Sequence, residues 1–155
     1  MGKMMSELTF ASARPIDLPG VRSLLSDAGL PSEDIEPHIG HFILAKNGAG
    51  LVGCVGLEPA GALGLLRSLA VASGFRGGGL GHELCDRLTR QARNLGVKEL
   101  YLLTTSAEGF FAKRGFARIE RRDAPDAIRA TEEFRTCCPS TAVCMKLDIS
   151  GAQYP

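Results

Sequence analysis

Apolar residues recur along the chain at two spacings, and each spacing predicts one type of element. Short apolar runs bounded by turn residues predict strands over residues 8–13, 42–45, 51–57, 65–71, 99–105, 116–121 and 141–147. Helical spacing predicts helices over residues 18–28, 32–38, 80–95, 107–113 and 127–134. Strands that alternate with helices in this way predict a mixed sheet covered by helices, an α/β (α+β) fold.

Capping and turn residues support these boundaries. Asp17 precedes the first predicted helix and Gly29 follows it, as residues that cap helices do. The pair Asn47-Gly48 separates two predicted strands and predicts a hairpin turn with positive φ at both residues. The third predicted helix carries one apolar stripe, which is expected in the core and consists of Leu80, Leu84, Leu88, Ala92 and Leu95.

Composition narrows the class of protein. The chain has 155 residues, of which 45% are hydrophobic, so we expect one domain over residues 1–155 with a substantial core. The formal net charge is only +1, which does not favour nucleic acid as a partner. No apolar stretch approaches the roughly 20 residues that span a bilayer, and no signal peptide is recognisable. We therefore expect a soluble, cytoplasmic protein without a membrane partner.

Five cysteines occur, and reduced thiols are expected because the number is odd and no export signal is present. Cys137, Cys138 and Cys144 cluster near the end of the chain. Their spacing lacks the second pair of ligands of a zinc site, so no metal is expected. Whether the three bind a soft ion stays open.

The run Arg-Gly-Gly-Gly-Leu-Gly, residues 76–81, follows a predicted strand and precedes a predicted helix. Glycines there allow a sharp turn with unobstructed N–H groups, and the following helix directs the positive end of its dipole to the same place. This arrangement is typical of a phosphate-binding loop. No Gly-Lys-Ser/Thr is present, and no acidic residue stands where a dinucleotide fold needs it.

The loop pattern Arg-x-x-Gly-x-Gly, at Arg76, Gly79 and Gly81, resembles the acyl-CoA loop of GNAT-type N-acetyltransferases. The segments at 65–71, 99–105 and 107–116 are similar to the fourth strand, the fifth strand and the following helix and turn of that family. The resemblance implies a GNAT fold: a mixed, mostly antiparallel sheet with splayed central strands, flanked by helices. It also implies acetyl-CoA as co-substrate, and it leaves a homodimer open.

The same resemblance implies which residues bind acetyl-CoA. Backbone groups of the fourth strand receive the pantetheine arm and hold the oxyanion, and the loop holds the pyrophosphate. The residues concerned are Leu69, Ala70, Val71, Arg76, Gly77, Gly78, Gly79, Leu80, Gly81, His82, Phe110 and Phe111.

The sequence indicates the catalytic groups less clearly than it indicates the residues that bind acetyl-CoA. Glu58 can accept a proton through water, or it is a solvated turn residue beside Pro59. His38 and His41 are either further candidates or exposed loop residues. Many relatives protonate the leaving thiolate with a tyrosine, whose place Phe111 takes here. That leaves Ser106, Tyr101 or a water as the donor, or departure of the free thiolate.

Arg67 interrupts an apolar strand, and a buried guanidinium needs an anion. A carboxylate or phosphonate-like group on the acceptor satisfies this need, and so does an Asp or Glu of a neighbouring element. We therefore predict that Arg67 binds the acceptor, with the ion pair as the alternative.

The segments RSLAV, LLTTSAEGFFAKRGF and IRATEEF are most similar to the GNAT proteins named for arsenic-resistance operons. Short amino-acid N-acetyltransferases that make N-acetylglutamate have a related layout. Both resemblances imply a small-molecule, amino-acid-like amine as acceptor. The alternative from another class is a non-catalytic CoA-binding or arsenical-sensing module that uses the three clustered cysteines.

Overall fold

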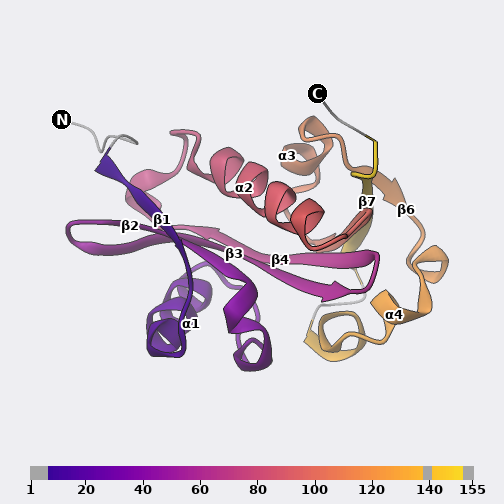
Figure 1. The fold of residues 1–155 in the computed structure, drawn as a ribbon, viewed down its shortest axis with the longest axis horizontal. Helices are drawn as coiled ribbons and strands as arrows, with labels where there is room; N and C mark the ends of the chain where they lie inside the picture. Colours follow the sequence, from indigo (N-terminus) through magenta and orange to yellow (C-terminus); the bar gives the residue numbers. More distant parts are fainter. Residues whose placement is uncertain (1–6, 138–140, 152–155) are drawn as a thin grey trace. The chain divides into compact units, whose positions relative to one another are not determined.

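A computed structural model describes residues 7–137 and 141–151 (Figure 1). Its strands are β1 (Thr9–Ser12), β2 (Phe42–Asn47), β3 (Gly50–Ala60), β4 (Leu63–Val71), β5 (Glu99–Thr104), β6 (Ala117–Ile119) and β7 (Val143–Asp148). Its α-helices are α1 (Leu18–Asp27), α2 (Leu80–Asn94), α3 (Glu108–Lys113) and α4 (Asp126–Arg129). Shorter helical turns are η2 (Pro15–Asp17), η3 (Glu36–His41), η4 (Ser73–Phe75), η5 (Arg121–Asp123) and the π-helical turn η6 (Glu133–Cys137).

The strands form one sheet in the order β1-β2-β3-β4-β5-β7-β6. The pairs β1–β2, β2–β3, β5–β7 and β6–β7 are antiparallel, and β4–β5 is parallel. The β4–β5 register covers only the pairs from Leu63↔Glu99 to Leu65↔Tyr101, although both strands continue further. The predicted mixed and mostly antiparallel sheet is confirmed.

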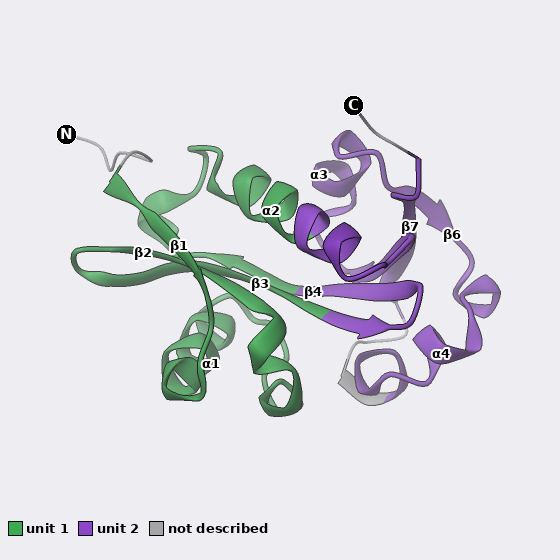
Figure 2. Ribbon diagram, viewed as in Figure 1, with its two compact units in different colours: residues 1–57, 68–88 green, residues 58–67, 89–155 purple. Residues whose placement is uncertain are grey.

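The chain divides into two compact units, which Figure 2 shows in different colours. Unit 1 comprises residues 1–57 and 68–88, and unit 2 comprises residues 58–67 and 89–155. Because β3, β4 and α2 each contribute residues to both units, the division does not follow the order of the sequence. The single domain expected from length stays a prediction.

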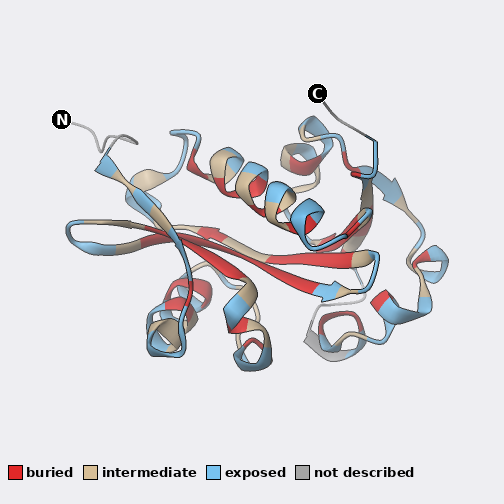
Figure 3. Cartoon of the chain, viewed as in Figure 1, coloured by how far each residue is buried: buried red, intermediate tan, exposed pale blue. Residues whose placement is uncertain are grey.

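Each unit has its own apolar core, and buried residues follow β3, β4 and one side of α2 in Figure 3. The core of unit 1 includes Val21, Leu25, Ile35, Phe42 and Cys54. The core of unit 2 includes Leu65, Tyr101, Ile128, Phe134 and Cys144. Among the described residues, no helix has both the length and the apolar character needed to cross a membrane.

Two details of the predicted elements are wrong. The β2–β3 turn has its positive φ at Gly50 (+130°) and at neither Asn47 nor Gly48. The Asn47 side-chain oxygen instead accepts the N–H groups of Ala49 and Gly50, which fixes a different turn. Leu95 is not in the core, because α2 ends one residue earlier and the terminating turn leaves Leu95 48% exposed.

Three predicted elements have other bounds. The helix expected over residues 127–134 breaks after α4, where the Thr131 hydroxyl donates to the Ile128 carbonyl. The helix expected over residues 32–38 is instead the 3₁₀ turn η3, since Pro37 has no N–H with which to continue an earlier helix. Strand β6 is shorter than predicted because η5 begins two residues after it.

Gly56 in β3 is required by packing within unit 1. A Cβ atom at this position would lie 2.5 Å from the ring of Phe42, which is completely buried. The buried ring has no free space to move into, so β2 and β3 depend on the absence of a side chain here.

We expect Gly56→Ala to lower the free energy of unfolding by about 1–3 kcal/mol, because overpacking forces the ring or the backbone to shift. Gly48→Ala is the matched control, since a Cβ at Gly48 meets no atom within 4 Å. Chemical denaturation of both variants measures the difference. Equal stability of the two variants would contradict the packing argument.

Candidate active site

The glycine loop leads directly into α2, as the sequence predicts. Gly77 and Gly79 have φ of +85° and +91°, a conformation that costs other residues energy. The first backbone bond of α2 runs from the N–H of Glu83 to the carbonyl of Gly79. The N–H groups of Leu80, Gly81 and His82 precede that bond, so they have no partner within the helix and remain available to an anion.

Gly53 in β3 determines how closely α2 approaches the sheet within unit 1. A Cβ atom at Gly53 would lie 3.0 Å from Leu84 and 3.1 Å from Leu80, both of which are buried. The loop therefore has a fixed support, because the first turns of α2 pack against bare backbone.

Two predicted loop residues have partners within the protein. The Arg76 Nε donates to the carbonyl of Val71 at 2.9 Å, which ties the loop to the end of β4. His82 lies 3.0 Å from Asp86 on the exposed surface of α2. Contact of either side chain with a phosphate stays a prediction.

Strand β4 has an unusual conformation at Ser68, where φ is +61°. It is the one residue other than glycine in the described ranges with a positive φ, and such strain costs about 1–3 kcal/mol. The Cys54 thiol of β3 donates to the Ser68 carbonyl at 3.3 Å. Burial raises the pKa of this thiol to about 12, so it keeps its proton. Leu69, Ala70 and Val71, the predicted backbone ligands of the thioester, follow directly.

Arg67 forms the centre of a buried triad in unit 2. Its NH1 lies 2.6 Å from Glu58 Oε2, and its Nε lies 3.4 Å from Glu133 Oε1. Arg67 is 2% exposed, Glu58 7% and Glu133 4%. Glu58 is therefore not a solvated turn residue, and Arg67 has the acidic partners that the second interpretation of the sequence requires. A role for Arg67 in acceptor binding stays a prediction.

The triad carries one guanidinium and two carboxylates, so its formal charge is −1 with both glutamates ionised. Two buried carboxylates beside one guanidinium stabilise its charge in the absence of water. Sequence reasoning missed Glu133, because the segment was expected to be an ordinary helix. The only available signal was an acidic residue beside apolar Phe134.

The predicted CoA-binding phenylalanines of α3 form an aromatic cluster. The ring of Phe111 is 4% exposed, and its centroid lies 5.1 Å from Phe110 and 5.6 Å from Phe116, both edge to face. Packing thus accounts for Phe111, while its contact with a ligand stays a prediction. Ser106 is exposed just before α3, and the Thr104 hydroxyl accepts the N–H of Ala107 to start that helix.

Tyr101 is occupied by a neighbour. Its hydroxyl donates to the Glu99 carboxylate at 2.7 Å. Burial and this contact raise the pKa of the phenol well above its ordinary value. Such a group is a poor proton donor at neutral pH, so Tyr101 is the weaker of the two side-chain candidates for protonating a thiolate.

The remaining candidates belong to other elements of the two units. His38 and His41 are both in η3 of unit 1. Cys144 is buried in β7, which raises the pKa of its thiol to about 11, whereas the side chains of Cys137 and Cys138 lie outside the described residues. The described residues contain no group of three His, Cys, Asp or Glu side chains that could hold a metal ion.

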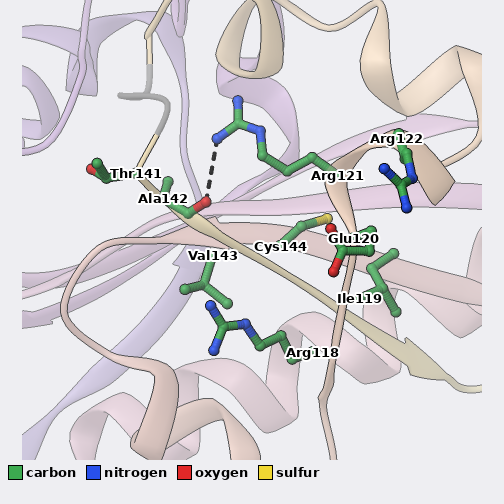
Figure 4. Close-up of a pocket in the computed structure, with 9 residues that line it drawn as sticks. All are labelled: Arg118, Ile119, Glu120, Arg121, Arg122, Thr141, Ala142, Val143 and Cys144. Atoms are coloured by element: carbon green, nitrogen blue, oxygen red, sulfur yellow. Dashed lines mark hydrogen bonds between the residues drawn. The ribbon is translucent and has the colours of Figure 1, made fainter.

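A hollow of about 380 Å³ in unit 2 is lined by Arg118, Arg121 and Arg122, together with Glu120 and the first residues of β7 (Figure 4). Figure 4 shows the Arg121 guanidinium turned towards the carbonyl of Ala142, to which it donates at 3.3 Å. Arg121 also donates to the carbonyl of Phe134, the residue after Glu133. The hollow is thus rich in cationic side chains, and its wall is joined to the segment that supplies the triad.

Comparison with known proteins identifies the family. The model of the acetyltransferase (GNAT) family matches residues 9–116, which is more than half of the chain. The chain belongs to the GNAT family. The glycine loop, β4 and α3 all lie within the matched region of this GNAT chain.

Related sequences carry more specific names. The GNAT chain is 37% identical over 99 residues to an amino-acid acetyltransferase of Azotobacter vinelandii, a match that covers 61% of the chain and 23% of the relative. It is 28% identical over 141 residues to an amino-acid acetyltransferase of Neisseria meningitidis, covering 83% of the chain and 32% of the relative. The matches therefore span 23% and 32% of the length of these relatives.

Solved structures share the fold. N-acetylglutamate synthase from Neisseria gonorrhoeae, complexed with coenzyme A and N-acetyl-glutamate, matches with a TM-score of 0.78 and 24% identity, over 92% of this chain and 35% of that one. A Mycobacterium tuberculosis protein in complex with CoA matches with a TM-score of 0.71 and 23% identity, over 90% of this chain and 98% of that one. At these identities the likeness concerns the fold.

We expect Arg67→Met to lower the free energy of unfolding by about 3–5 kcal/mol, because two buried carboxylates lose their shared cation. Glu133→Gln is the matched variant, since it removes one carboxylate and leaves the Glu58 contact in place. Its stability should remain within about 1 kcal/mol of the wild type. Chemical denaturation at pH 7 measures both, and a normal stability for Arg67→Met would contradict the triad.

Proposed function

We propose that this chain transfers the acetyl group of acetyl-CoA to the primary amine of a small, amino-acid-like molecule. Family membership supports acetyl transfer, and the names of the related sequences support an amino acid as acceptor. The observation that carries the proposal is the buried triad of Glu58, Arg67 and Glu133 in β3, β4 and η6.

The loop fits the diphosphate of acetyl-CoA. Gly77 and Gly79 supply the conformation of the turn, and the free N–H groups at the start of α2 favour negative charge. The backbone of Leu69, Ala70 and Val71 is assigned to the pantetheine arm and the thioester carbonyl. When bound, acetyl-CoA supplies the activated acetyl group.

The triad fits the amine. An amine in water at neutral pH is an ammonium ion, which a carboxylate attracts. The amine must lose a proton before it can attack the thioester, and Glu58 accepts that proton directly or through a water. Arg67 holds the Glu58 carboxylate in place through the 2.6 Å contact.

The departure of CoA needs less assistance from side chains than the attack of the amine does. A thiol with a pKa of about 8.5 is already a fair leaving group. Phe111 has no proton to give, and Tyr101 is engaged with Glu99. Ser106, exposed between β5 and α3, is therefore the proposed side-chain donor, and unassisted loss of the thiolate is the alternative.

The arginine-lined hollow supports an acceptor with a carboxylate. Arg118, Arg121 and Arg122 surround it, and its wall continues into the segment of Glu133. We assign the carboxylate of the acceptor to this cationic surface, since Arg67 already pairs with two glutamates. None of the relatives described above bears a name that mentions arsenic, so the proposal includes no arsenic compound.

We expect Gly79→Ala to weaken CoA binding at least tenfold, because the alanine resists the φ of +91° at a cost of about 1–2 kcal/mol and reshapes the loop. Gly78→Ala is the control, since its Cβ would lie 3.8 Å from the nearest atom and its φ is ordinary. It should bind CoA within threefold of the wild type. Calorimetry compares the two, and equal affinities would remove the loop from the site.

Thiol release from acetyl-CoA in the presence of a panel of amines tests the reaction. We expect turnover with small amino acids, and weaker turnover with their decarboxylated analogues and with peptides. Glu58→Gln should lower acceptor kcat/KM by about a hundredfold or more, as expected for loss of a general base, while CoA affinity is unchanged. Release with peptides alone would contradict the acceptor class, and the absence of release with every amine would favour a CoA-binding module.

A further inference from the structure

Cys54 is a completely buried residue of β3 whose thiol contacts β4 within unit 1. It donates to the carbonyl of Ser68 at 3.3 Å. This carbonyl belongs to the peptide bond between Ser68 and Leu69. The thiol of Cys54 therefore fixes the peptide plane that contains the N–H of Leu69.

The orientation of Leu69 follows from peptide geometry. All described peptide bonds are trans, so the carbonyl and the N–H of one peptide point in opposite directions. Because the Ser68 carbonyl points to Cys54, the N–H of Leu69 points away from β3. The N–H of Leu69 is thus turned outward from this pair of strands.

The hydrogen bond from Cys54 reaches β4 at the residue whose backbone conformation is strained. Ser68 has φ of +61°, which a residue with a side chain adopts only when its surroundings impose it. The Cys54 contact is on the carbonyl of that same residue. A buried thiol that keeps its proton remains a donor at every pH at which the protein functions.

We propose that Cys54 is a positioning residue for acetyl transfer: it aims the Leu69 N–H at the carbonyl oxygen of the thioester. The inference rests on the proposed function, in which β4 receives the acetyl-CoA arm. A fixed N–H donor stabilises the negative charge that develops on this oxygen when the amine attacks. Cys54 is not proposed to touch either substrate; it acts through the backbone of Ser68.

Three variants separate positioning from packing. Cys54→Ala removes the donor, Cys54→Ser keeps a hydroxyl donor in its place, and Cys85→Ala removes another buried thiol of unit 1, on α2. We expect Cys54→Ala to lower kcat at least tenfold, with CoA affinity within threefold of the wild type because the glycine loop is intact. Cys54→Ser should recover at least half of the wild-type kcat. Cys85→Ala should match the wild type in kcat.

A second measurement does not depend on the acceptor. In the ¹⁵N-labelled protein, the Leu69 amide resonance should shift more with acetyl-CoA than with CoA, and this difference should be at least twofold smaller in Cys54→Ala. If no amine supports turnover, the proposed acceptor fails, while this titration still decides the role of Cys54. Equal kcat in Cys54→Ala and Cys85→Ala at matched melting temperature, no rescue by serine, or an unchanged Leu69 response would each overturn the inference.

Discussion

Polar groups that enter the buried strands β3 and β4 must find their partners there, and the architecture of both units depends on this constraint. Arg67 forms ion pairs with Glu58 and Glu133. The carbonyl of Ser68, a residue with positive φ, accepts a hydrogen bond from the Cys54 thiol. Among the described residues, no buried side-chain nitrogen or oxygen lacks a partner. Because an unpaired buried group costs far more than a paired one gains, these contacts specify a single arrangement of the strands.

The packing of unit 1 also requires that two positions of β3 carry no side chain. Gly53 lets the first turns of α2 approach the strand, and Gly56 makes room for the buried ring of Phe42. The start of α2 is where the N–H groups for an anion are exposed, so the position of the proposed diphosphate site follows from a glycine more than twenty residues earlier in the chain.

The two halves of the proposed chemistry use different physical devices. In unit 1, the proposed CoA site consists of backbone N–H donors. They are presented by glycines with positive φ, by the start of α2 and by the strand that contains Ser68. In unit 2, the proposed acceptor site consists of charged side chains, namely two buried carboxylates around one guanidinium and the arginines of the hollow. Backbone donors suit the proposed co-substrate acetyl-CoA, whereas side chains can differ from one acceptor to another.

The sequence alone determined the order of the elements, the glycine loop and the family. These depend on local patterns: apolar spacing, capping residues and glycines whose φ is set by their immediate neighbours. It also identified Arg67 as a residue that needs an anion. Its resemblance to arsenic-resistance proteins has no support in the relatives described here.

Only the tertiary structure decided which anions Arg67 contacts, because Glu58 and Glu133 reach it from segments 9 residues before and 66 residues after it in the printed sequence. A helical pattern also does not reveal the break after α4, where the Thr131 hydroxyl donates to the Ile128 carbonyl. The hydrogen bond between Cys54 and Ser68 likewise could not be predicted from the sequence. Contacts between distant segments arise from the packing of the whole chain, and no local spacing encodes them.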